Sequence, residues 1–167
     1  LAQNPEMISA YPQKNSPKTN YQYLIITPAQ YQNGYQGLIS YYQSIGITCQ
    51  VATTESIASG MTGVDIQEQI RNYIIQEYQN SSIDYVLIGG TETVVPSRRT
   101  YCIVYYGTGG MEEEASDIPA DIYYSALDGT WDENENGIFG EEADNADLIP
   151  DVDVGRFPFT DEAELAS

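Results

Sequence analysis

The chain has 167 residues, and a hydrophobic fraction of 41% is enough for one globular domain with a buried core. Its net charge is −19, from 25 acidic and only 6 basic residues, so a nucleic-acid-binding or anionic-membrane-binding surface is excluded. No apolar run approaches the roughly 18 residues of a membrane-spanning helix, which excludes a membrane span.

The first part of the chain divides into an arm and the start of a domain. Residues 1–20 are polar and contain several prolines, which is typical of a lead-in arm, and residues 21–167 are predicted to form a single domain. Tyr21–Thr27 is apolar enough for a strand covered on both faces. Pro28–Ile45 carries apolar residues three or four positions apart, which predicts an amphipathic helix.

The next elements repeat this alternation. Ile47–Thr53 is rich in β-branched residues and predicts a second strand. After a short turn, Asp65 is a good N-cap for a second helix. The apolar stripe of that helix consists of Ile66, Ile70, Tyr73, Ile74 and Tyr78. Asp84–Gly90 is a third buried strand, so the order β-α-β-α-β predicts a parallel, doubly wound, three-layer α/β sheet.

The remaining segment differs from this pattern. Three further strands are predicted at Arg99–Tyr106, Ile118–Ala126 and Asp151–Phe157, as an added β segment near the C-terminus. Gly107–Gly110 and Glu112–Glu114 are predicted to form an exposed loop between the first two.

The chain ends soon after a predicted helix start. Thr160 is the expected N-cap, and Asp161 and Glu162 suit the positive end of the helix dipole. A helix that stops at Ser167 would be marginal without packing. We therefore expect the chain to be a piece of a longer protein, truncated at its C-terminus.

The clearest chemical pattern is a calcium-loop spacing that starts at Asp132. The residues Asp132, Asn134 and Asn136 supply side-chain oxygens at positions 1, 3 and 5, Gly137 provides the turn, and Ile138 offers a carbonyl at position 7. Hard cations such as Ca²⁺ need six to eight such oxygens. The spacing predicts a weak structural Ca²⁺ site, and a solvated acidic turn without metal is the alternative.

The loop does not follow the pattern to its end. Position 12, where a bidentate glutamate is expected, is Ala143. Glu142 and Asp144 are therefore the predicted further ligands, with Asp147 as another option, on a shifted loop.

No catalytic residue can be assigned within the chain. Histidine is absent, so Ser-His, Cys-His and His-metal mechanisms are excluded for this chain alone. Cys49 and Cys102 are interpreted as small buried apolar residues, with a single disulfide as the alternative. Gly89–Thr91 follows a strand but lacks a phosphate-loop pattern, and is interpreted as a packing feature. Arg156, amid carboxylates, is predicted to form an internal ion pair, with recognition of a substrate carboxylate as the alternative.

Six segments between Tyr23 and Phe159 resemble, in order and spacing, the gingipain family of cysteine peptidases. They are Tyr23-Leu-Ile-Ile-Thr-Pro28, Glu68-Gln-Ile-Arg-Asn-Tyr-Ile74, Asp84-Tyr-Val-Leu-Ile-Gly-Gly90, Val95-Pro96, Asp121-Ile-Tyr-Tyr124 and Pro150-Asp-Val-Asp-Val-Gly-Arg-Phe-Pro158. The resemblance implies a caspase-like fold, similar in its layers to flavodoxin, of which this chain would be the first of two halves. It also implies a secreted, commonly calcium-dependent peptidase whose catalytic His and Cys lie in the second half.

Three functions follow as hypotheses. The favoured one is the N-terminal, non-catalytic scaffold of a secreted gingipain-like endopeptidase, with the missing C-terminal catalytic half and a peptide or protein substrate as partners. The second is a non-catalytic extracellular calcium-binding or adhesion module. The third, a small-molecule-binding domain of the receiver or Rossmann type, is weakened by the missing phosphate loop.

Overall fold

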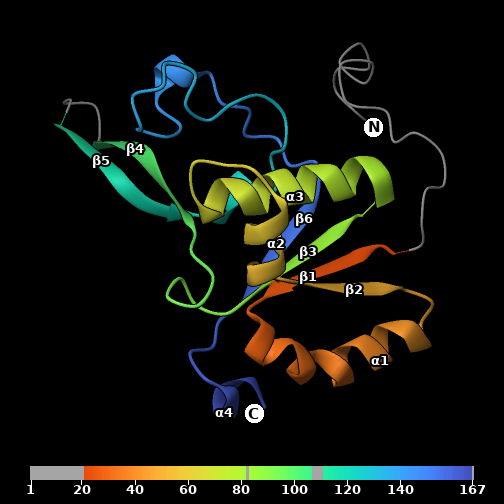
Figure 1. Ribbon diagram of the computed structural model, residues 1–167. Coiled ribbons are helices and arrows are strands. Elements are labelled where there is room, and N and C mark those ends of the chain that lie inside the picture. The colour runs from red at the N-terminus through yellow and green to blue at the C-terminus, as the bar shows by residue number, and fades with distance from the viewer. Residues whose placement is uncertain (1–20, 82, 107–110, 167) are drawn as a thin grey trace.

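A four-stranded parallel sheet forms the centre of the molecule (Figure 1). The computed structural model describes residues 21–81, 83–106 and 111–166. In spatial order the strands are β2 (Cys49–Thr53), β1 (Tyr23–Thr27), β3 (Tyr85–Gly89) and β6 (Asp153–Phe157). Each neighbouring pair is parallel, which confirms the predicted α/β class.

Helices lie on both faces of this sheet (Figure 1). One face carries α1 (Gln36–Ser44), and the other carries α2 (Thr54–Gly60) and α3 (Ile66–Ser81). Parallel sheets need such cover because the connections between their strands cross over the faces. The three layers match the predicted arrangement.

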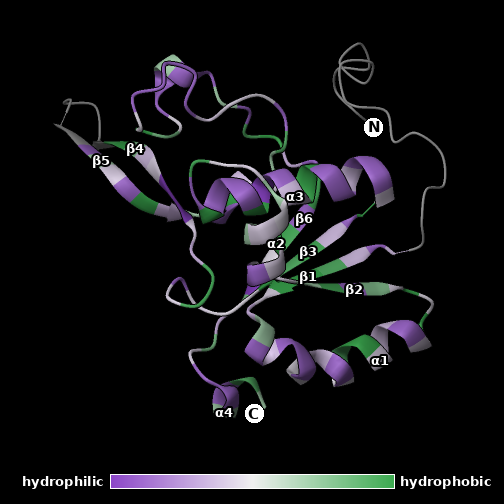
Figure 2. Ribbon diagram, in the orientation of Figure 1, coloured by the Kyte–Doolittle hydropathy of each residue, from purple (hydrophilic) through white to green (hydrophobic). Residues whose placement is uncertain are grey.

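The alternation of side chains along β1 produces two cores. Leu24 and Ile26 pack with Ile74 of α3, whereas Ile25 packs with Tyr35 on the face of α1. All five side chains are essentially buried. The hydropathy colouring in Figure 2 shows hydrophobic stretches in the central strands and mixed, largely hydrophilic helices.

The start of α3 follows the sequence prediction, whereas the start of the first helix differs from it. Asp65 caps α3 as predicted, because its Oδ1 accepts the backbone N–H of Glu68 at 2.9 Å. The expected helix Pro28–Ile45 is instead the 3₁₀ helix η2 (Ala29–Tyr35) followed by α1. Asn33 and Gly34 disfavour the α-helix in that stretch, which explains the tighter first part.

The turn expected after β2 is the short helix α2. Thr53 caps it, since its hydroxyl accepts the backbone N–H of Ser56. The serines and the glycine of this stretch suggested a turn, but the buried Ile57 anchors it against the core.

A separate antiparallel pair consists of β4 (Arg98–Tyr106) and β5 (Met111–Ala120). The strand expected at Arg99–Tyr106 is confirmed, and Gly107–Gly110 lies outside the described residues. The exposed loop predicted for Glu112–Glu114 is wrong, because these residues pair with β4. Hydrogen bonding between the two strands outweighs the unfavourable strand propensity of the glutamates.

The strand expected at Ile118–Ala126 ends at Ala120 and continues as the 3₁₀ helix η4 (Asp121–Tyr124). Tertiary bonds bend the chain there: the Tyr124 hydroxyl donates to the carbonyl of Pro96 at 2.6 Å. Such long-range contacts leave no local sequence signal.

The last elements are shifted slightly from their predicted bounds. The final strand starts at Asp153 rather than Asp151, after the 3₁₀ helix η5 (Glu142–Asp144). The short helix α4 (Glu162–Leu165) is capped by Asp161, not Thr160, because the Asp161 carboxylate accepts two backbone N–H groups.

Arg156 of β6 joins the connection between β3 and β4 to the start of η4. Its guanidinium forms a two-pronged ion pair with Asp121, with both N···O distances at 2.7 Å. The remaining N–H groups donate to the carbonyls of Gly90 and Val95 and to the hydroxyl of Ser97. The predicted internal ion pair is confirmed.

The Gly89–Thr91 turn is a packing feature, as expected. The backbone N–H groups of Gly90 and Thr91 donate to the carbonyls of Phe157 and Phe159, so neither is free for a phosphate. A Cβ at Gly89 would collide with the Tyr35 hydroxyl. None of the helices in the described ranges is both long and apolar enough to cross a membrane.

We predict that Arg156→Met lowers the free energy of unfolding by about 3 kcal/mol, because it leaves the Asp121 carboxylate without its partner. Arg99→Met is the matched control: Arg99 is 54% exposed and pairs with Glu92 at the surface. That change should cost about 0–1 kcal/mol. Urea unfolding measures both, and equal losses would contradict the assignment.

We further predict that Gly89→Ala destabilises the fold by about 1–3 kcal/mol through its collision with Tyr35. Tyr35→Phe in the same chain should recover part of the loss, since it removes the colliding oxygen. Gly37→Ala, in open space on α1, should instead stabilise by about 0.5–1 kcal/mol. Thermal melts of these three variants and of Tyr35→Phe alone test the coupling.

Candidate functional site

A buried arginine fixes the backbone that follows η4. Arg71 of α3 donates from Nε to the carbonyl of Tyr123 at 3.1 Å. Its Nη2 donates to the carbonyls of Ala126, Asp128 and Gly129 at 3.0–3.3 Å. Burial lowers the pKa of this guanidinium, which still carries its charge at any ordinary pH. The arginine therefore determines where the chain leaves the core toward the acidic loop.

A second arginine, Arg98, holds the first turn of α3 and an aromatic group together. Its two terminal nitrogens bind the Asp65 carboxylate at 2.7 Å each. The guanidinium carbon also lies 3.9 Å from the ring centre of Phe139 and 4.7 Å from that of Tyr123. Burial opposes ionisation of Asp65, but the hydrogen bonds from Arg98 and from the Glu68 backbone lower its pKa overall.

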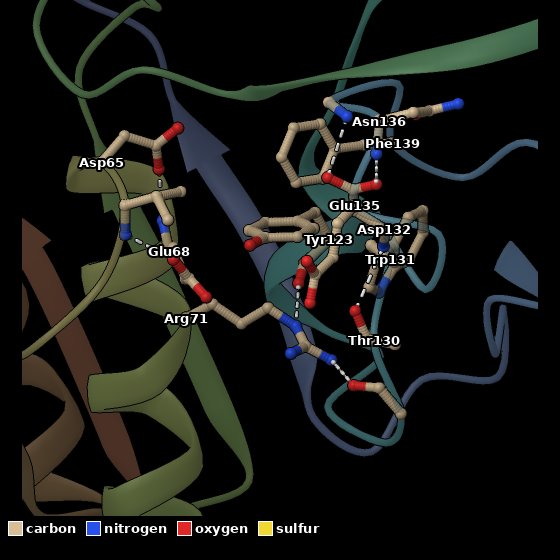
Figure 3. A pocket seen from close by; sticks show the side chains of 13 residues that line it. Asp65, Glu68, Arg71, Tyr123, Thr130, Trp131, Asp132, Glu135, Asn136 and Phe139 are labelled. Carbon is tan, nitrogen blue, oxygen red and sulfur yellow. Dashed lines mark hydrogen bonds between the residues drawn. The ribbon is translucent and has the colours of Figure 1, made fainter.

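A pocket of about 770 Å³ lies between the start of α3 and residues 129–139 (Figure 3). Its aromatic wall consists of Tyr123, Trp131 and Phe139, with edge-to-face contacts made by Tyr123. Its carboxylates belong to Asp65, Glu68, Asp132 and Glu135. With Arg71 committed to carbonyl groups, the pocket presents mainly negative charge, which favours a cation.

The loop that starts at Asp132 folds back on itself through short-range hydrogen bonds. The Asp132 carboxylate accepts the backbone N–H of Asn136 at 2.9 Å and that of Gly137 at 3.0 Å. Asn134 Oδ1 accepts the same N–H of Asn136 at 3.0 Å. Gly137 has a φ of +80°, the left-handed conformation that the turn glycine of such loops adopts.

The residue that closes this loop in the structure is Glu141, which the sequence analysis did not select. Its Oε1 accepts N–H groups from the side chains of Asn134 at 2.6 Å and Asn136 at 2.8 Å. Asn134, Asn136 and Glu141 therefore converge at one place. Their carboxylate and amide oxygens belong to the ligand types that Ca²⁺ prefers.

Two of the predicted further ligands lie elsewhere. Asp144 is 3% exposed, and its carboxylate accepts the backbone N–H groups of Glu133, Gly140 and Glu141 at 2.9–3.0 Å. It supports the loop from behind rather than meeting the asparagines. Glu142 is exposed and makes no contact with Asn134 or Asn136 among the described hydrogen bonds.

Ile138 is 37% exposed, and its N–H donates to Asn136 Oδ1 at 2.7 Å. Within the described ranges, no group of three or more acidic or cysteine side chains is close enough to hold a metal ion by itself. Amide and backbone oxygens would have to complete any coordination shell.

The two cysteines are free thiols on different sheets, Cys49 on β2 and Cys102 on β4. Each is partly exposed rather than fully buried as expected, and the disulfide alternative does not occur in this structure. Burial raises the pKa of the Cys49 thiol, which reduces its thiolate fraction and hence its nucleophilicity. The sequence contains no histidine that could activate either one.

The roles of Arg71 and Trp131 were not predicted from the sequence. The local signal for Arg71 is its position directly after Ile70 of the predicted apolar stripe. A cation at such a position needs internal acceptors. Trp131 directly precedes the loop and is 4% exposed, but an isolated tryptophan gives no positional information.

Comparison with known proteins identifies the relationship. The sequence model of peptidase family C25 matches residues 16–167. A complex of the pro- and mature domains of Porphyromonas gingivalis RgpB has a TM-score of 0.57 and 21% identity, over 87% of this chain and 26% of that chain. The Arg-specific cysteine proteinase gingipain R gives the same score and identity, over 90% of this chain and 28% of that one.

A third solved structure, described as a protease, has a TM-score of 0.57 and 14% identity, over 96% of this chain and 28% of that chain. At these identities the structures show a shared fold, and the chain spans little more than a quarter of their length. No curated protein matches. Because the family model covers nearly the whole chain, the chain belongs to peptidase family C25, the gingipain family of cysteine peptidases.

Proposed function

We propose that this chain is the N-terminal scaffold of a secreted gingipain-like cysteine endopeptidase and does not cleave peptides by itself. The observation that carries the proposal is the combination of a C25 match over residues 16–167 with a complete lack of histidine. Thiolate attack on a peptide needs a base, which in this family would have to come from another part of the protein.

The lengths of the similar solved structures also support a separate catalytic half. They are three to four times longer than the matched region, which leaves room for a second half that carries the catalytic His and Cys. In the intact protein, the cysteine thiol would transfer its proton to the imidazole. The resulting thiolate would then attack the peptide carbonyl. Backbone N–H groups would stabilise the oxyanion. The present chain would pack beside the catalytic half and contribute loops to the rim of the substrate cleft.

We also propose that the loop at Asp132 binds one structural Ca²⁺. Asp132, Asn134, Asn136 and Glu141 would hold the ion with their side-chain oxygens, and Ile138 with its carbonyl. The support is the convergence of the two asparagine amides on Glu141 and the left-handed Gly137. A bound dication would neutralise part of the local acidic charge and cross-link the loop.

An extracellular location fits this chemistry. Ca²⁺ sites of moderate affinity are filled at extracellular calcium concentrations, with dissociation constants of roughly 10⁻⁴–10⁻³ M. The strongly acidic composition, with only 6 basic residues, agrees with such a setting.

The calcium site predicts a melting temperature that rises with Ca²⁺ and much less with Mg²⁺, which prefers a smaller octahedral shell. Glu141→Gln should weaken the calcium-dependent rise by about tenfold in apparent affinity, because it removes a charged ligand. Glu142→Gln is the matched control at the next position and should leave the rise unchanged. Titration calorimetry without heat, or equal effects of the two variants, would contradict the site.

The peptidase proposal predicts hydrolysis of fluorogenic peptides by the longer protein, and loss of that activity after alkylation with iodoacetamide. The 167-residue chain alone should give no hydrolysis. Activity that survives alkylation would exclude a cysteine mechanism. A folded longer protein without hydrolysis would instead favour the non-catalytic calcium-binding or adhesion module.

A further inference from the structure

A second hollow, of about 610 Å³, lies between the β4–β5 pair and the segment after the acidic loop. Its apolar wall includes Tyr101 and Ile103 of β4 and Ile138 of the facing loop. The hydrogen bond from the Tyr101 N–H to the Phe139 carbonyl, at 2.8 Å, fixes the two sides relative to each other. The groove is therefore a defined feature of the fold, separate from the pocket beside α3.

Three glutamates, Glu114, Glu141 and Glu142, also line this groove. Glu114 lies directly opposite Ile103 in the register of β4 and β5, so a carboxylate and an aliphatic side chain stand side by side. Glu114 and Glu142 are exposed. The groove thus combines an apolar wall with negative charge at its rim.

No cation within the described ranges neutralises these carboxylates. Arg71 donates to backbone carbonyls, Arg98 pairs with Asp65, and Arg156 pairs with Asp121. Arg99, on the same strand pair, binds Glu92 at 2.5 Å. The described part of the chain therefore supplies no positive charge to this groove.

From this complementarity we propose that the groove docks an extended basic segment of a partner polypeptide, with lysine or arginine side chains. Such side chains lay their aliphatic stems along Tyr101, Ile103 and Ile138, while their charged ends reach Glu114 and Glu142. An acidic or purely apolar segment leaves the rim carboxylates without partners and is disfavoured. This inference does not depend on peptidase activity.

The test uses the full 167-residue chain and a fluorescein-labelled peptide, acetyl-Ala-Lys-Leu-Arg-Ala amide, with binding followed by fluorescence anisotropy at low ionic strength. The Glu-Leu-Glu counterpart of the peptide should not bind. The double variant Glu114→Gln with Glu142→Gln should weaken binding by about tenfold or more, because it removes both rim charges. Ala143→Phe, which fills the groove from a lining position, should abolish binding.

The matched control is the double variant Glu133→Gln with Glu162→Gln, which removes the same charge from exposed positions outside the groove. It should change the affinity by less than about twofold. Equal weakening by both double variants would show attraction to the overall charge of −19 and overturn the proposal. Binding that persists in Ala143→Phe, with the fold verified by circular dichroism, would overturn it as well.

Discussion

Three arginines, the buried Arg71 and Arg98 and the partly buried Arg156, hold the segment from Asp121 to Gly129 against the rest of the domain. Arg156 forms an ion pair with Asp121, the first residue of the segment. Arg98 lies over the Tyr123 ring, and Arg71 donates hydrogen bonds to backbone carbonyls between Ala126 and Gly129. The segment has little regular structure of its own, so its position depends on these bonds. Because it leads directly into the loop at Asp132, both the pocket and the groove depend on the same three side chains.

This use of arginine has a consequence for the surface. The chain has only 6 basic residues against 25 acidic ones. Three of the basic residues, Arg71, Arg98 and Arg156, form hydrogen bonds or ion pairs within the domain. Among residues 21–81, 83–106 and 111–166, no arginine pairs with the carboxylates around the loop and the groove. Self-repulsion of this kind weakens a compact state unless cations or basic partners bind. Calcium at the loop and a basic segment in the groove would relieve the same repulsion at two neighbouring places.

The central sheet could be predicted because its signals are local. Continuous apolar strands and amphipathic helices occur in strict alternation, and Asp65 caps α3 where its position indicates. The segments that were predicted wrongly are those whose conformation is determined from a distance. Glu112–Glu114 forms a strand through pairing with β4, and the chain turns at Asp121 because Arg156, 35 positions later, holds it there.

The same distinction explains the partial prediction of the loop. Its first half is local: Asp132, Asn136 and Gly137 fold back on one another through bonds that span at most five positions. The position of its closing residue, Glu141, depends on η5. There the Asp144 carboxylate accepts the backbone N–H groups of Gly140 and Glu141. That anchoring brings the side chain of Glu141 onto the asparagines, while Glu142 faces the groove. Glu141 thus belongs to both the loop and the groove, whereas Glu142 lines the groove alone, which is why Glu142→Gln serves as the control for calcium binding.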